Sequence, residues 1–139
     1  MPEVMVNYLA VIVAALVPMV VGFVWYSPML FGNLWMKESG MTAADMSAAK
    51  KSGMQMTYLI ALLGTLVMSY VLEHFVKYLA IDTLGLALSL AFWIWLGFVA
   101  TTLLDNVLWN KKSWTYYAVG AGYKLVGLIL MTIILAIWQ

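Results

Sequence analysis

The last apolar run of the chain, residues 114–138, reads WTYYAVGAGYKLVGLILMTIILAIW. It exceeds the about 20 residues that one helix needs to cross a bilayer, and its only charged side chain is Lys124. Three further apolar runs precede it, at residues 4–24, 54–78 and 84–108. The four runs predict an all-α integral membrane protein in which four transmembrane helices form a small bundle.

The composition of the whole chain also indicates a membrane protein. Of its 139 residues, 65% are hydrophobic and 9% are charged, whereas soluble domains average roughly 45–50% apolar and about 25% charged residues. The four runs and their connections use nearly the whole length, so we expect a single membrane domain over residues 1–139. The first run follows Glu3, where a secretory signal would carry a basic residue, and we therefore expect a retained span.

The charged and reactive residues disfavour several functional classes. The net charge is +1 and the basic residues do not cluster as nucleic-acid binding requires, so we expect no nucleic-acid partner. The chain has no cysteine and one histidine, His74. A zinc site and thiol chemistry are therefore not expected, and neither is a cofactor. An enzyme is the weakest class, because catalysis needs convergent acids, bases or metals.

Small residues recur along the apolar runs at helical spacing. The stripes are Ala10, Ala14, Pro18 and Gly22 in the first run, and Gly120 and Gly127 in the last. Such stripes let helix backbones approach closely within a membrane. Four spans can hardly enclose a hydrated path alone, so we expect these stripes to pack within the chain or between copies, with a homodimer as the simplest oligomer.

The only long connection, residues 25–53, lies between the first two runs. A Ser-Pro pair at residues 27–28 is typical of a helix start and Gly40 of a helix end, and the segment between them is apolar enough to lie at the headgroup level. We therefore expect a helical interfacial connection. A capping-box pattern at Thr42 predicts a second, polar helix that ends at Gly53.

The lysines between the runs predict the orientation in the membrane. Lys37, Lys50, Lys51, Lys111 and Lys112 fall in the first and third connections, whereas Lys77 falls on the other side. Lysines accumulate on the cytoplasmic side of short loops, so we expect both termini outside. Glu73, His74 and Lys77 end the second run, where we expect a solvated helix end with an i,i+4 ion pair.

One group of residues resembles a known family. The group is Trp25, Tyr26, Ser27, Pro28, Phe31, Gly32 and Trp35 near the first connection, with Asn7 before it and Ala121, Gly122 and Tyr123 in the last run. Together they resemble the bacterial and archaeal membrane family catalogued as domain of unknown function 1761. The resemblance covers nearly the full chain and implies a small four-helix bundle in a prokaryotic inner or plasma membrane, with no settled activity.

The third and fourth runs carry the one set of residues that could form a polar site. Asp105 lies near the end of the third run, and Lys124 lies about ten residues, or about 15 Å, into the fourth. In an antiparallel hairpin the two side chains can meet. The candidate ligand or ion pathway is Asp105, Lys124, Thr101, Thr102 and Asn106. A lone charge within the bilayer costs at least a few kcal/mol, which favours pairing or snorkelling.

Two interpretations of this set are open. In the first, Lys124 snorkels to the headgroups and, through Asp105 and Asn106, only holds the register of the hairpin. In the second, it belongs to a ligand or ion pathway of an oligomeric transporter, or is the counter-ion of a bound anion. The alternative function is an accessory or scaffold subunit, whose tryptophan-rich belt and interfacial helix would dock onto a partner protein.

Overall fold

A computed structural model describes residues 2–139, and helices are the regular structure of this described part. Four of its segments are long and apolar enough to cross a membrane. They are α1 (Tyr8–Trp25), α4 (Gln55–Tyr78), the segment Leu84–Leu108 and α8 (Trp114–Ile137). The predicted fold class, an all-α protein with four transmembrane helices, is confirmed.

The third span is not one regular helix. It consists of α5 (Leu84–Ile94), the π-helix η1 (Trp95–Ala100), and the short helices α6 (Thr101–Leu103) and α7 (Asp105–Leu108). Trp95, the first residue of η1, donates its indole N–H to the carbonyl of Ala121 in α8 at 2.8 Å. The irregular turns of this span are thus attached to the neighbouring helix, and such π-helical turns occur frequently at functional sites.

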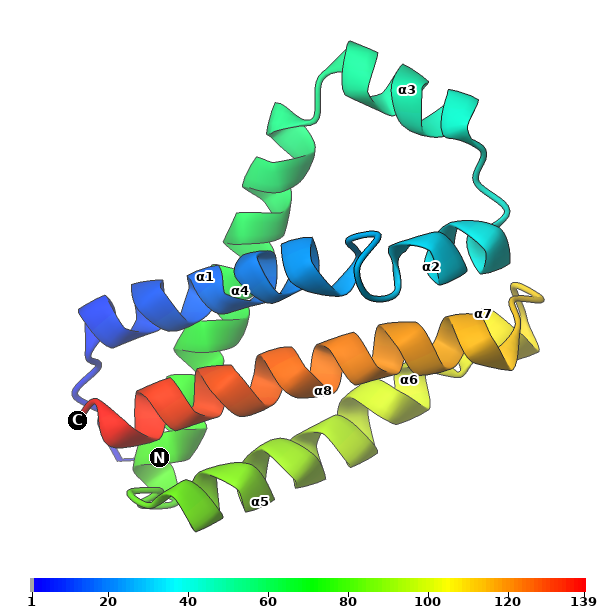
Figure 1. Ribbon diagram of the computed structural model, residues 1–139. Helices are drawn as coiled ribbons and strands as arrows, with labels where there is room; N and C mark the ends of the chain where they lie inside the picture. The colour runs from blue at the N-terminus through cyan, green and yellow to red at the C-terminus, as the bar shows by residue number, and fades with distance from the viewer. Residues whose placement is uncertain (1) are drawn as a thin grey trace.

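Helix α8 lies between α1 and α5, and α4 crosses behind α1 and α8 (Figure 1). Both chain ends lie at one end of the bundle, which we call the terminal face, together with the turn between α4 and α5. The opposite end, the loop face, carries the connection from α1 to α4 and the connection into α8. Toward the loop face, α4 diverges from the other three spans (Figure 1).

Small side chains fill most of the core where the spans meet. The fully buried alanines are Ala10, Ala14 and Ala15 of α1 and Ala87 and Ala91 of α5, and they pack with the larger buried side chains of Met131 and Leu135 of α8. Alanine allows helix backbones to approach closely, which is the main way in which helices gain packing energy within a membrane. Many of the larger side chains of the same helices face outward, where lipid would cover them.

The connection from α1 to α4 contains two short helices, α2 (Gly32–Ser39) and α3 (Ala43–Ser52). The predicted start of the first at residues 27–28 is wrong, because residues 27–31 form turns. The Ser27 hydroxyl donates back to the carbonyl of Val24 at 2.7 Å, and so does not cap α2. Helix α2 ends at Gly40, as predicted. Gly40 adopts a left-handed backbone conformation, with a φ of 77°, which is typical of a helix end.

Helix α3 begins with the predicted capping box. The Asp45 N–H donates to the Thr42 hydroxyl at 3.1 Å, and the Thr42 N–H donates to the Asp45 carboxylate at 2.9 Å. The helix is followed by Gly53, with a φ of 84°. None of its residues is buried, so α3 is held by its own caps more than by packing.

Candidate functional site

A cavity of about 590 Å³ lies between α1, α4, α8 and the third span. Apolar and small side chains form most of its lining, including Pro18 of α1, Gly64 of α4, Val99 of η1 and Leu128 of α8. Lys124 is the only charged residue in the lining. It is the eleventh of the 24 residues of α8, so its backbone lies near the middle of a span. The Lys124 side chain is exposed on the surface of the protein. The cavity therefore combines an apolar wall with one exposed lysine whose backbone lies at membrane depth.

Lys124 has no carboxylate near it. The only ion pair within 4.0 Å in residues 2–139 joins Glu73 to Lys77. The Lys124 ammonium instead lies 5.4 Å from the centroid of the Tyr123 ring, which gives a modest cation–π attraction. The two hydroxyls in the lining already donate elsewhere: Tyr123 to the Pro18 carbonyl at 2.6 Å, and Thr65 to the Leu62 carbonyl at 3.0 Å. The ammonium is thus the available donor in this cavity.

The structure does not bring Asp105 and Lys124 together. Val99 lines the cavity beside Lys124, and Asp105 lies six residues further along the span, a rise of about 9 Å. The intervening turns place the Asp105 side chain on an exposed surface. The pairing expected from an ideal antiparallel hairpin is therefore not formed.

The other residues of the candidate pathway also lie outside the cavity lining. Thr101 and Thr102 are exposed, and their hydroxyls donate to the carbonyls of Gly97 at 2.8 Å and Phe98 at 2.6 Å in their own span. The peptide carbonyl of Asn106 accepts from the Lys112 N–H at 2.8 Å. Of the five residues, the structure places Lys124 in the cavity and the other four between the cavity and the loop face.

The small-residue stripe of α1 faces its neighbours in the bundle. Ala10, Ala14 and Pro18 are buried. A Cβ on Gly127 of α8 would lie 3.9 Å from the Pro18 ring, and a Cβ on Gly22 would lie 3.2 Å from the Tyr123 hydroxyl oxygen. Gly120 differs, because a Cβ there would have no neighbour within 4 Å.

Residues 25–35 contact helix α8 and connect it to the end of α1. We call this contact the aromatic joint. Trp25 donates its indole N–H to the Val119 carbonyl at 3.0 Å. The Tyr26 ring lies 5.3 Å from that of Tyr123, and the Trp35 ring lies 6.5 Å from that of Tyr116. These rings pack within the chain, whereas the sequence interpretation used them as a belt or docking surface.

Burial in the aromatic joint changes the chemistry of Tyr26. Burial, followed by the neighbouring phenols of Tyr123 and Tyr116, raises the pKa of Tyr26 to about 12. The phenol therefore stays neutral at all physiological pH values. Its part in the joint is packing, and it is not poised to exchange a proton.

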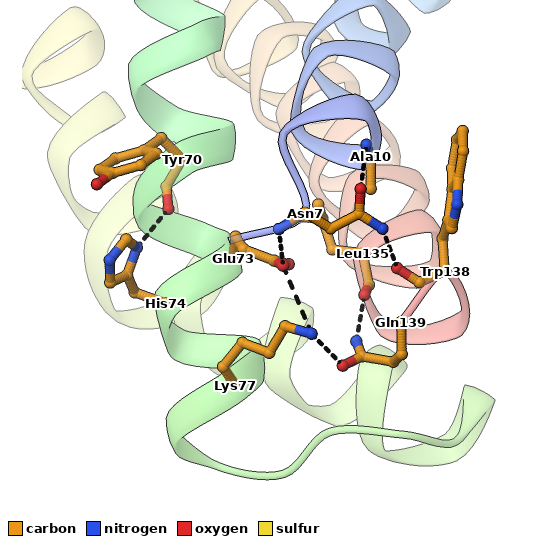
Figure 2. Close-up of polar contacts among 9 residues, drawn as sticks. All are labelled: Asn7, Ala10, Tyr70, Glu73, His74, Lys77, Leu135, Trp138 and Gln139. Atoms are coloured by element: carbon orange, nitrogen blue, oxygen red, sulfur yellow. Dashed lines mark hydrogen bonds and ion pairs between the residues drawn. The ribbon is translucent and has the colours of Figure 1, made fainter. Parts of the chain in front are cut away.

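A polar cluster on the terminal face ties the two chain ends to α4 (Figure 2). Glu73 is fully buried, and its Oε1 accepts from the Asn7 N–H at 3.2 Å and lies 3.8 Å from the Lys77 ammonium. The Asn7 side chain donates to the Trp138 carbonyl at 3.0 Å, and Lys77 donates to Gln139 at 2.6 Å. The expected solvated helix end is wrong for Glu73, because the beginning of α1 covers it.

A weak sequence signal for this burial exists on α4. Ser69 precedes Glu73 by four residues, so the two side chains share one helix face. Ser69 is also buried, and its hydroxyl donates to the Val11 carbonyl at 2.8 Å.

The residues 2–139 contain no group of three or more His, Cys, Asp or Glu side chains that could hold a metal ion. The hydrogen bonds and the ion pair of the cluster join the two chain ends to α4.

The fold and the cavity together define a small four-span membrane protein with one cation in an apolar intramembrane cavity. A family model described as "Protein of unknown function (DUF1761)" matches residues 9–136. The chain belongs to this family, which confirms the resemblance seen in the sequence. No curated protein and no solved structure matches the chain.

Proposed function

We propose that this protein binds an anionic ligand inside the membrane at Lys124 and carries it across the bilayer. The observation that supports this function is a lysine whose backbone lies near the middle of a span and whose exposed side chain lines an apolar cavity, with no carboxylate within 4.0 Å in residues 2–139. Ionisable residues within membranes are costly and commonly mark pathways or ligand counter-ions. A bound anion would supply the missing counter-charge.

The polar residues of the third span give this ligand a route toward the loop face. Thr101, Thr102 and Asn106 follow Val99, which lines the cavity, in the order of the chain toward that face, whereas the Asp105 carboxylate carries the same charge as the ligand and lies exposed beside this route. In the proposed transporter, two copies of the chain shield this route from lipid, since its side chains are exposed or half-buried in one copy. The cavity is then the binding site and this segment the continuation of the pathway.

The first test compares the wild-type protein with Lys124→Met and Lys124→Arg, purified in mild detergent and then denatured to release bound small molecules. Mass spectrometry should find an anionic molecule with the wild type and with Lys124→Arg, which keeps the charge. Lys124→Met should release it in an amount lower by about tenfold, the effect of losing about 1.4 kcal/mol of binding energy. The same oligomeric state in all three variants is the control, and the same released molecules in all three would refute the proposal.

An accessory or scaffold role is the alternative, and helix α3 is the observation that favours it. This helix is capped at its start, yet none of its residues is buried, so it presents a preformed surface at the loop face. A cross-linker reacting with Lys50 or Lys51, both exposed on α3, should then capture one defined membrane protein. A single homogeneous particle that contains this chain alone would count against the scaffold role.

A further inference from the structure

We infer that the ligand held at Lys124 is a single-chain amphiphile with one carboxylate, of the fatty-acid class, and that it enters the cavity sideways from the bilayer. This inference rests on the proposed function, because it names the chemical class of the anion at the same site. Three properties of the cavity support the inference: its hydrogen-bond donors, its size and lining, and the direction of its opening.

The donors in the cavity match a small monoanionic group. Lys124 supplies one ammonium, and the hydroxyls of Tyr123 and Thr65 donate to carbonyls within the protein. All seven basic residues of the chain are lysines, so an anion at this site meets a single point charge and not the planar fork with which arginine holds carboxylate or phosphate at two points. A phosphate monoester has more acceptor oxygens and more charge than one ammonium satisfies. A carboxylate has one charge and two oxygens, which fits this set better.

The size and the lining of the cavity match one hydrocarbon chain. At about 30 Å³ for a water-sized group, the cavity of about 590 Å³ holds roughly twenty such groups. A methylene is of similar size, so a carboxylate with a chain of about 16 carbons fills this volume, whereas the second chain of a phospholipid would lie outside it. Beyond Lys124, the walls are apolar side chains such as Met68, Leu72 and Met131, which favour an alkyl chain over a polar solute.

The opening of the cavity faces the position of the lipid. Gly64, Met68, Val71 and Phe75 of α4 line the cavity and are also exposed on the surface of the molecule. They lie within the second span, at depths where the surroundings are hydrocarbon. This wall results from the divergence of α4 from the other spans (Figure 1). A ligand dissolved in the bilayer reaches Lys124 through this side directly from the hydrocarbon region.

The test measures binding of radiolabelled palmitate to the purified full-length protein in nanodiscs of zwitterionic lipid. Palmitate should bind at about one molecule per chain. Hexadecanol, with the same chain and no charge, and acetate, with the charge and no chain, should compete at least about tenfold more weakly. Lys124→Met should weaken palmitate binding by about tenfold or more, while Lys124→Arg should stay within a few-fold of the wild type.

A second variant tests the place of the alkyl chain independently of the charge. A Cβ added at Gly64 would have no neighbour within 4 Å, so Gly64→Leu places a side chain in the cavity without a clash. It should weaken palmitate binding by about tenfold. Gly85→Leu is the matched control, because Gly85 is equally open and lies outside the lining, and it should bind as the wild type does. Equal thermal unfolding of the two variants shows that the fold is kept.

The outcomes separate this inference from the proposed function. Equal competition by hexadecanol, or normal palmitate binding to Lys124→Met or Gly64→Leu, overturns the inference. If the molecule released in a Lys124-dependent manner is a phosphate ester or a two-chain lipid and palmitate does not bind, the inference fails while the proposed function stands. If a second copy of the chain fills the groove, Gly64→Cys forms a disulfide-linked dimer and no anion is released, which overturns both.

Discussion

The Phe31-Gly32 pair shows why a single residue matters in the aromatic joint. The Gly32 N–H donates to the Ser27 carbonyl at 2.9 Å, which closes the turn after α1. A Cβ on Gly32 would collide with the Tyr26 carbonyl oxygen and would lie 2.8 Å from the carbonyl carbon of Ser27. Only glycine allows this approach of two backbone segments, and it thereby places the Phe31 ring 4.7 Å from that of Trp25.

Gly32→Ala should therefore destabilise the protein. The added methyl group collides with backbone atoms that cannot rotate away, and overpacking of this kind costs about 1–3 kcal/mol. Thermal unfolding in detergent measures the loss. Gly64→Ala is the control, since a Cβ there meets no atom within 4 Å, and it should be neutral or gain up to about 1 kcal/mol from helix propensity. Equal stability of the two variants would contradict the role given to the turn.

Among the elements, α3 is stabilised by an ionised side chain. Hydrogen bonds from the Thr42 backbone, and next from its side chain, hold the pKa of the Asp45 carboxyl below its ordinary value of 3.8. Since the pKa is lower in the folded helix than in the unfolded segment, the carboxylate stabilises α3 above the unfolded pKa. This contribution is lost as the pH falls through the folded pKa.

Acidification should accordingly loosen α3 before the spans. As the pH falls from about 7 to below 3.8, hydrogen exchange of the α3 amides should become faster than the intrinsic pH dependence explains. Asp45→Asn should remove this extra acid sensitivity. The start of α5 is an internal control, because its cap is the Thr83 hydroxyl, which does not titrate in this range. Equal acid sensitivity of α5 and α3 would contradict the assignment to Asp45.

On the scale of the whole molecule, the even number of spans places both chain ends on the terminal face. Most lysines lie at the loop face, in the connections between the spans. Because lysines accumulate on the cytoplasmic side of short loops, we predict that the loop face lies toward the cytoplasm. The divergence of α4 is also a property of this scale, because it creates the cavity from residues of four spans. No single helix carries the site.

Cysteine labelling tests the orientation. The chain has no native cysteine, so Pro2→Cys, Lys50→Cys and Lys111→Cys each carry a single reactive group at an exposed position. In intact cells a membrane-impermeant maleimide should label Pro2→Cys and leave the other two unreacted until the cells are opened. The reverse pattern would show that both termini are inside.

Features that depend only on residues close together in the chain could be predicted from the sequence. The four spans follow from runs of apolar residues, and the end of α2 and the cap of α3 follow from Gly40 and from the Thr42–Asp45 pattern. The family was also evident from the residues of the aromatic joint. Within the site, Lys124 stood out because a lone charge in an apolar run is costly wherever the helices pack.

The tertiary structure alone decided which side chains meet. The sequence placed Glu73 at a solvated helix end, whereas the Asn7 backbone, 66 residues away, covers it. Asp105 and Lys124 are apart because Asp105 lies three residues from the end of the third span, whereas Lys124 lies ten residues into α8, and the cavity lies where α4 leans away. Apolar content determines that a helix enters the bilayer. Its rotation, tilt and breaks depend on contacts between residues distant in the chain, which composition and local spacing do not specify.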